Sequence, residues 1–249
     1  MAGHSKWAQI KRKKAVTDAR RGQLWTRLLK EITVAARIGG GDPDGNARLR
    51  TAIQDARTNN VPNDNIDRAV KRGTGELDGV AYEEVTYEGY GPGGAAVLIE
   101  TVTDNKNRTV AEIRHLFSKH GGNLSESGSV AWMFVSRGYF AIEKETMAED
   151  EFMELALSVN AEDIATEDET YEIFTSPEAF AATKDALGGH EIALATSELA
   201  RIPQNYTELE SGAVESNLRL LEALEDHDDV QNVWTNFSFD SESVEALSD

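Results

Sequence analysis

The chain has 249 residues, no cysteine and a formal net charge of −19, with 40% of its residues hydrophobic. The absence of cysteine excludes disulfides, thiol nucleophiles and zinc–thiolate sites. No apolar run approaches the roughly 20 residues of a membrane-spanning helix, and no signal-peptide h-region follows the basic N-terminus. We therefore expect a folded, cytoplasmic protein without membrane contacts that is long enough for two or three domains.

The charge is divided unevenly along the chain. Residues 1–72 hold 16 Lys and Arg against 7 Asp and Glu, whereas residues 73–249 hold 9 against 37. Phosphate repels a chain that is negative throughout. An asymmetry this large instead indicates a basic head that docks on nucleic acid while the acidic remainder is held away from it.

Residues 1–76 are predicted to be helical, without any strand. Over about residues 18–38, apolar side chains recur at helical spacing on one side, and basic side chains fall on the other. The basic ones are Arg20, Arg27, Lys30 and Arg37. A second helix is expected over about residues 46–58, and a third between Pro62 and a stop at Gly73. The pattern predicts a three-helix bundle, whose basic side alone is most often only a solvated surface.

From residue 82 onward the periodicity becomes that of strands alternating with helices. Residues 138–197 are predicted to follow the order βαββαβ, which is the ferredoxin-like motif. Residues 82–136 would supply only three strands and one helix, which leaves a sheet face and an edge uncovered. The expected strands are 82–88, 95–102 and 129–135, with a helix over 105–120.

A C-terminal helix near residues 211–226 and a strand near 230–239 would complete that uncovered layer. The predicted fold is therefore α+β, with a helical N-terminal domain and two α/β-sandwich domains, the ferredoxin-like one inserted in the other. Three consecutive domains are the alternative. The expected domains are 1–76, 82–136 with 206–240, and the inserted 137–205.

Motifs for catalysis, cofactors or metals are not found. The glycine-rich run at residues 89–94 opens a strand rather than a helix, so it predicts a hairpin and not a dinucleotide fingerprint. None of the five histidines pairs with another at helical spacing, and the acidic clusters lack the spacing of a calcium loop. We therefore expect no catalytic, cofactor or metal site, and a protein that is not an enzyme.

The N-terminal arm is the strongest candidate for binding. It combines donors for phosphate with an aromatic ring, Trp7, that could stack on a base or ribose. The alternative is a charged terminus with Trp7 packed on the bundle. The arm lies directly before the basic helix, and six to ten basic residues on one surface is roughly the scale of strong, salt-dependent phosphate binding.

Several longer motifs closely resemble the YebC/PmpR family over essentially the whole chain. They are Met1–Trp7, Gly39–Pro43, Tyr87–Gly94, Asp104–Glu112 and Gly121–Leu124. The resemblance implies three domains and a DNA-binding transcriptional regulator. Some members of that family instead look like ribosome-associated translation factors, and none is known as an enzyme.

The resemblance also implies a set of nucleic-acid-binding residues. In place of the family's usual Lys-His-Arg-Lys, this chain has Lys-Arg-Lys-Lys at 11–14, which keeps the charge but could alter base-specific contacts. Together with the basic side of the helix, the expected binding residues are His4, Ser5, Lys6, Trp7, Lys11, Arg12, Lys13, Lys14, Arg20, Arg21, Arg27, Lys30 and Arg37.

Two hypotheses of function remain open on the sequence, and a third is compatible with either. The first is a DNA-binding regulator of transcription. The second is a translation factor on the ribosome that binds ribosomal RNA or tRNA. The third is an interaction scaffold that binds proteins through the acidic α/β domains. The chain shows neither dimeric helix-turn-helix spacing nor an RRM aromatic signature that would decide between DNA and RNA.

Overall fold

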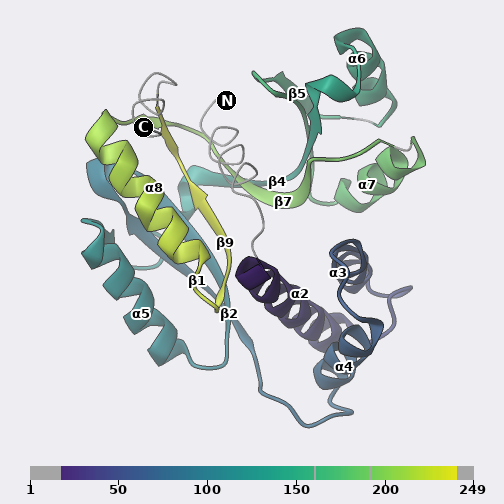
Figure 1. Ribbon diagram of the computed structural model, residues 1–249, viewed down its shortest axis with the longest axis horizontal. Helices are drawn as coiled ribbons and strands as arrows, with labels where there is room; N and C mark the ends of the chain where they lie inside the picture. The colour runs from purple at the N-terminus through teal and green to yellow at the C-terminus, as the bar shows by residue number, and fades with distance from the viewer. Residues whose placement is uncertain (1–17, 160, 191, 240–249) are drawn as a thin grey trace. The chain divides into compact units, whose positions relative to one another are not determined.

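The computed structural model describes residues 18–159, 161–190 and 192–239, with side chains from residue 21 onward (Figure 1). Within them, residues 18–131 together with 207–239 form one compact unit, and residues 132–206 form another. The fold is α+β, as predicted. Among the helices of the described residues, none combines the length and apolar character needed to cross a membrane.

The N-terminal helical segment consists of α2 (Asp18–Gly39), α3 (Ala47–Thr58) and α4 (Asn63–Thr74). These bounds agree with the sequence prediction to within one or two residues. Asn46 caps α3, because its Oδ1 accepts a hydrogen bond from the Leu49 amide at 3.1 Å. The segment has its own core, which includes Ile32, Ala35, Ala36, Leu49, Ala52, Ile53, Ala56, Val61, Ile66 and Ala69.

Gly73 has a role that differs from the predicted one. It lies inside α4, and the helix instead ends at Gly75, whose φ of +81° is the left-handed conformation that favours glycine. A Cβ atom on Gly73 would lie 2.4 Å from the carbonyl oxygen of Thr33 and 2.7 Å from the Cβ of Ala36. Glycine is therefore present here because α4 approaches the backbone of α2 closely.

The same unit contains a four-stranded antiparallel sheet in the order β3-β1-β2-β9. Two helices, α5 and α8, contact each other and pack beside this sheet (Figure 1). The C-terminal pair α8 and β9 thus completes the sheet that β1 and β2 begin. The bounds are β1 (Glu83–Tyr90), β2 (Ala96–Thr103), α5 (Lys106–Lys119), β3 (Asn123–Leu124), α8 (Ser211–Glu225) and β9 (Val230–Thr235). A short parallel pair, β8 (Thr207–Glu208) and β10 (Phe237–Ser238), accompanies it.

The strand expected over residues 129–135 does not form as predicted, because only residues 134–135 lie in a strand, and that strand belongs to the second unit. Residues 131–133 make a 3₁₀ turn, and the third strand of the sheet is the two-residue β3. The physical cause is Glu88, whose carboxylate accepts hydrogen bonds from the amides of Gly128, Val130 and Ala131 at 2.7, 2.6 and 2.8 Å. Amides held by one carboxylate cannot join a ladder, although the residue types favour a strand.

The second unit has the predicted ferredoxin-like order βαββαβ, with an antiparallel sheet ordered β5-β6-β4-β7. Aromatic packing holds its core, in which the rings of Phe152 and Tyr171 stack with centroids 4.5 Å apart. The last strand begins at Thr196 rather than near residue 192 as predicted. The elements are β4 (Phe134–Glu143), α6 (Glu149–Ser158), β5 (Asp163–Thr166), β6 (Thr170–Thr175), α7 (Phe180–Gly189) and β7 (Thr196–Pro203).

Candidate nucleic-acid interface

The middle of the basic side of α2 is turned into the protein. Lys30 is only 8% exposed. Its Nζ donates hydrogen bonds to Asp229 Oδ1 at 2.8 Å, to the Asp228 carbonyl at 2.9 Å and to the Val102 carbonyl at 3.3 Å. An ammonium with three acceptors has no donor left for a phosphate. The expectation that Lys30 belongs to a basic surface is therefore wrong.

Asp229 is the centre of this buried network. Its Oδ2 accepts hydrogen bonds from Thr103 at 3.1 Å, from Thr109 at 2.8 Å and from Arg108 at 2.7 Å. Burial acts to raise the pKa of this carboxyl, but the hydrogen bonds from Lys30, Arg108 and Thr109 outweigh it and hold the pKa well below its usual range. The charges of Lys30 and Asp229 thus compensate each other inside the unit.

Arg27 is also drawn toward acidic residues rather than toward solvent. It is half-buried, and burial lowers the pKa of its guanidinium even though Glu225, Asp226 and Asp228 act to raise it. Its Nε is buried and has no hydrogen-bond partner within the described residues. Arg27 and Lys30 therefore turn the central part of α2 toward the residues around 225–229.

The other predicted binding residues are not brought together by the described structure. Arg21 and Arg37 are exposed, near opposite ends of α2. The residues of the arm lie outside the described residues, as does the side chain of Arg20, and their role stays a prediction. These arm residues are His4, Ser5, Lys6, Trp7, Lys11, Arg12, Lys13 and Lys14.

Sequence reasoning missed the basic residues of α4. Arg68, Lys71 and Arg72 are exposed, and none of them forms an ion pair with a carboxylate in the described part of the chain. Arg48 on α3 differs, because it pairs with both Glu31 and Glu84 at 2.6 Å. The missed signal is the cluster of three basic residues within five positions at 68–72.

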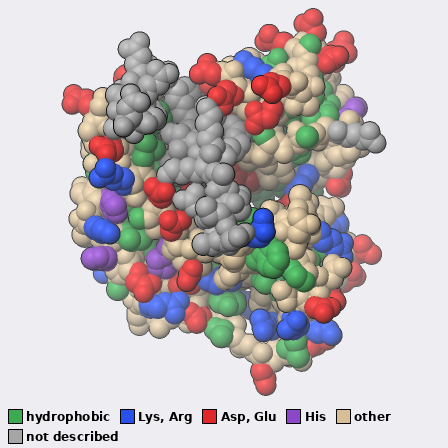
Figure 2. Space-filling model, in the orientation of Figure 1, with side chains coloured by type: hydrophobic (Ala, Val, Ile, Leu, Met, Phe, Trp, Pro, Cys, Tyr) green, Lys and Arg blue, Asp and Glu red, His purple; other side chains and the backbone are tan. Residues whose placement is uncertain are grey.

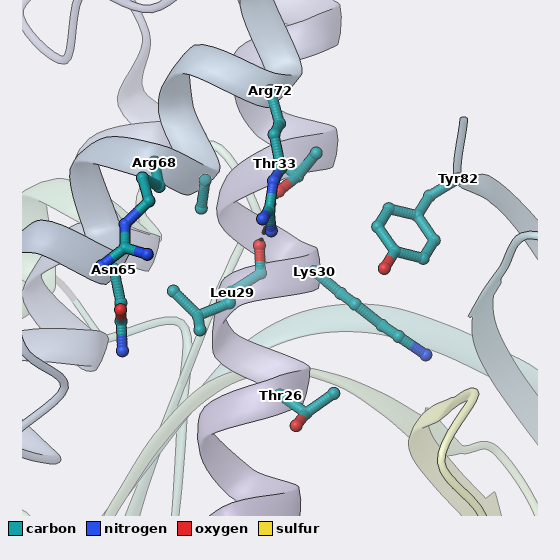
Figure 3. A pocket seen from close by; sticks show the side chains of 9 residues that line it. Thr26, Leu29, Lys30, Thr33, Asn65, Arg68, Arg72 and Tyr82 are labelled. Atoms are coloured by element: carbon teal, nitrogen blue, oxygen red, sulfur yellow. Dashed lines mark hydrogen bonds between the residues drawn. The ribbon is translucent and has the colours of Figure 1, made fainter. Parts of the chain in front are cut away.

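A groove of about 250 Å³ runs between α2 and α4 (Figure 3). Each helix contributes side chains one turn apart, so the groove follows a single face of each. Tyr82, just before β1, lies beyond Lys30, whose Nζ is 5.5 Å from the centre of the ring. The lining residues are Thr26, Leu29, Lys30, Thr33, Asn65, Arg68, Ala69, Arg72 and Tyr82, with no Asp or Glu among them.

On the face drawn in Figure 2, several acidic side chains gather around α6. Residues 132–206 hold 16 Asp and Glu against 4 Lys and Arg. Among the residues that the structure describes, no group of three or more His, Asp or Glu is arranged to hold a metal ion. The run at residues 89–94 forms a hairpin turn with positive φ at Gly93 and Gly94, as predicted.

Comparison with known families matches both parts of the chain. Residues 5–76 match the family described as "TACO1/YebC protein N-terminal domain", and residues 82–237 match "TACO1/YebC second and third domain". The chain belongs to the TACO1/YebC family. This confirms the resemblance found in the sequence motifs.

Full-length relatives and a solved structure agree with this membership. A protein of Desulfosudis oleivorans is 55% identical over 98% of this chain and 99% of its own length. One of Syntrophus aciditrophicus is 53% identical over the whole of both chains, and each is named "Probable transcriptional regulatory protein". The crystal structure of a conserved hypothetical protein from Aquifex aeolicus has a TM-score of 0.87 at 44% identity. It covers 95% of this chain and 98% of that one.

Proposed function

We propose that this protein is a non-enzymatic regulator of gene expression that binds nucleic acid through its helical N-terminal segment and the arm before it. The observation that carries the proposal is the set of exposed basic residues on α4, which lack carboxylate partners in the described residues of a chain with 44 Asp and Glu. The names of the relatives support a regulatory role in transcription. Duplex DNA is accordingly the first candidate partner.

Electrostatics supports a localised contact. The arm contributes five Lys and Arg and no carboxylate over residues 1–17, and α4 adds Arg68, Lys71 and Arg72. Basic residues that neutralise phosphates release counterions, which makes binding strong at low salt and weak at high salt. The acidic unit at 132–206 repels phosphate, so the favourable contact is confined to the basic head.

The second candidate is a ribosome-associated translation factor that binds ribosomal RNA or tRNA. The groove between α2 and α4 favours it, because a space of about 250 Å³ admits one nucleotide rather than a duplex. Unpaired nucleotides are frequent in the loops of folded RNA and are the usual targets of RNA recognition. The acidic unit would then face basic protein partners, with which its charge is complementary.

A charge-matched pair of variants of the full chain tests the proposal. One variant replaces Lys11, Arg12, Lys13 and Lys14 by Gln, and the control replaces Arg114, Lys119, Lys144 and Arg219 by Gln. Fluorescence anisotropy would follow binding to duplex DNA and to a structured RNA while the salt concentration is varied. We expect only the first variant to lose affinity and to flatten the salt dependence by about four phosphate contacts. Equal losses in both variants would contradict the proposal.

Sedimentation separates the two candidates. In a sucrose gradient of cell extract, a translation factor travels with ribosomes, whereas a transcriptional regulator stays near the top or with DNA. Because the contact is electrostatic, the gradient should be run at low salt, and a second run at raised salt should release the protein. Co-sedimentation that the four-Gln arm variant abolishes would favour the ribosomal role.

A further inference from the structure

We propose that the groove between α2 and α4 binds one unpaired nucleotide of a nucleic-acid strand, with its phosphate held between Arg68 and Arg72. This inference rests on the proposed function and specifies the form of nucleic acid that the helical segment selects. It shifts the binding site from the predicted basic side of α2 to the facing sides of α2 and α4.

The two arginines line one groove, and a phosphate that enters it can be reached by both. They lie four residues apart on α4, so they are neighbours on its surface, and both line the groove (Figure 3). Arg68 uses its Nε to bind the Asp64 carbonyl of its own helix at 3.1 Å, and its two terminal nitrogens remain for a ligand. Guanidinium groups bind phosphate oxygens through paired hydrogen bonds, which makes two adjacent arginines a strong phosphate site.

The groove carries a net positive charge because basic side chains line it and acidic ones do not. The lining contains no carboxylate, and the charge of Lys30 is already compensated by Asp229 at 2.8 Å. The net charge that a ligand meets there therefore comes from Arg68 and Arg72. An anion entering the groove encounters no repulsion from a wall residue.

The remaining wall fits a nucleobase. Leu29 and Ala69 give the groove an apolar surface, on which a base removed from its stack can lie. Thr26 and Thr33 donate their hydroxyl hydrogens to carbonyls of their own helix, at 3.0 and 2.8 Å, and keep lone pairs to accept from a base. The side-chain amide of Asn65 forms no hydrogen bond within the described residues. Such an amide can donate one hydrogen bond to a base edge and accept another from it.

Two variants separate the groove from general electrostatics. Arg68→Gln with Arg72→Gln removes both phosphate donors. The control, Arg57→Gln with Arg114→Gln, removes the same charge from exposed positions of α3 and α5 that do not line the groove. Thr26→Phe fills the groove from an exposed position without any change of charge. Thermal unfolding of each variant verifies that it is folded before binding is compared.

Binding of the full chain would be measured by fluorescence anisotropy with three probes of one sequence: single-stranded RNA, single-stranded DNA and duplex DNA. We expect Arg68→Gln with Arg72→Gln to weaken single-strand binding by about tenfold relative to the control. It should also lower the salt slope by about 0.7, the value for one phosphate contact on a single strand. Thr26→Phe should weaken single-strand binding by about tenfold through loss of the base contact, and should leave duplex binding unchanged.

The RNA and DNA probes identify the source of the nucleotide. If the groove variants lose the same affinity for single-stranded RNA and single-stranded DNA, the site binds phosphate and base. If they lose affinity only for RNA, the site also contacts the 2′-hydroxyl. The groove site would be overturned if Arg68→Gln with Arg72→Gln lost no more affinity than the control. It would also be overturned if the groove variants lost as much affinity for duplex DNA as for the single strands. If the wild-type chain still binds nucleic acid in that case, the proposed function stands. Failure of the wild type to bind any probe would overturn the proposed function itself.

Discussion

Helices α2 and α4 carry similar basic residues in the same helical segment, but their charges have different surroundings. On α2, Lys30 is buried against Asp229 and Arg27 is half-buried near acidic residues. On α4, Arg68 and Arg72 are exposed and line a groove that contains no carboxylate. The charges of Lys30 and Arg27 are therefore compensated within the unit, whereas those of Arg68 and Arg72 face solvent in the groove.

The difference shows what a helical wheel does and does not indicate. It correctly places Arg27 and Lys30 on the side of α2 opposite the apolar stripe, but it does not show which other residues pack against that basic side. Here the covering residues lie some two hundred positions further along the chain, in the turn after α8 that contains Asp229. Only the fold brings a basic residue and its distant carboxylate together.

The largest effect is expected from removing the carboxylate that α2 depends on. Asp229→Ala leaves Lys30 buried without its counter-charge, which typically costs about 3–5 kcal/mol of unfolding free energy. Urea denaturation at neutral pH measures it. The control is Glu215→Ala, which removes the exposed partner of Arg219 within α8 and should cost less than about 1 kcal/mol. A loss for Asp229→Ala as small as that of the control would contradict the contrast between the two helices.

The hydrogen-bond network around Asp229 also predicts how the unfolding free energy depends on pH. The pKa of Asp229 is lowered in the folded state, so the stability it contributes is fully present above the unfolded pKa, near about 4. That stability is lost as the pH falls through the lower, folded pKa. We therefore expect the difference in unfolding free energy between wild type and Asp229→Asn to be constant from neutral pH down to about 5 and to shrink at lower pH. A difference that shrinks already near neutrality would show that another group is titrating.

A smaller effect is expected where α4 rests on α2. Gly73→Ala would place a Cβ 2.4 Å from the Thr33 carbonyl oxygen and should cost about 1–3 kcal/mol as the helices separate. Gly22→Ala is the matched control: its Cβ would meet nothing within 4 Å, and alanine should stabilise α2 by about 0.5–1 kcal/mol. In thermal unfolding, the melting temperature should fall for Gly73→Ala and rise for Gly22→Ala. Gly73→Ala should also weaken nucleic-acid binding, although it removes no charge, because it alters the groove.

Much of the fold could be predicted because its signals are local. Apolar periodicity with Gly and Pro at the ends located the three N-terminal helices, and the order βαββαβ was visible in the chain. The first part of the strand expected at 129–135 does not form, because a distant carboxylate, Glu88, holds the amides of Gly128, Val130 and Ala131. Long-range hydrogen bonds of this kind leave no periodic pattern.

The candidate site could be predicted only in part for the same reason. The sign and position of the basic head follow from composition, but which basic residues remain exposed depends on tertiary pairing. Lys30 was expected at the surface and is buried, whereas Arg68 and Arg72 were not among the expected binding residues and are exposed. The close approach of α4 to α2 at Gly73 was likewise missed, because the sequence indicated this residue only as a helix stop.

Trp7 provides a test of the arm against the groove. An aromatic ring that stacks on an unpaired base contributes roughly 1–3 kcal/mol, so Trp7→Ala should weaken binding to looped RNA by that amount and leave duplex DNA binding nearly unchanged. Anisotropy measurements on both probes would show it. An equal, small loss on both would favour a duplex-binding regulator. A lowered melting temperature with unchanged binding would place Trp7 in the core of the helical segment, and the stacking hypothesis would fail.

The smallest effect on binding is expected from deleting residues 132–206, which tests the proposal that they form an inserted domain. Phe134 pairs with Pro203, and the backbone amide of Gln204 donates a hydrogen bond to the Met133 carbonyl at 2.8 Å. The two ends of this unit are therefore adjacent, and a short linker can join residue 131 to residue 207. We expect the shortened chain to unfold cooperatively and to retain its affinity for nucleic acid. Because the deleted residues hold 16 Asp and Glu against 4 Lys and Arg, affinity should rise slightly at low salt, and the gain should vanish at moderate salt as the repulsion is screened. Loss of binding with retained folding would show that the acidic unit takes part in the contact, and would end the division between a basic binding head and an acidic body.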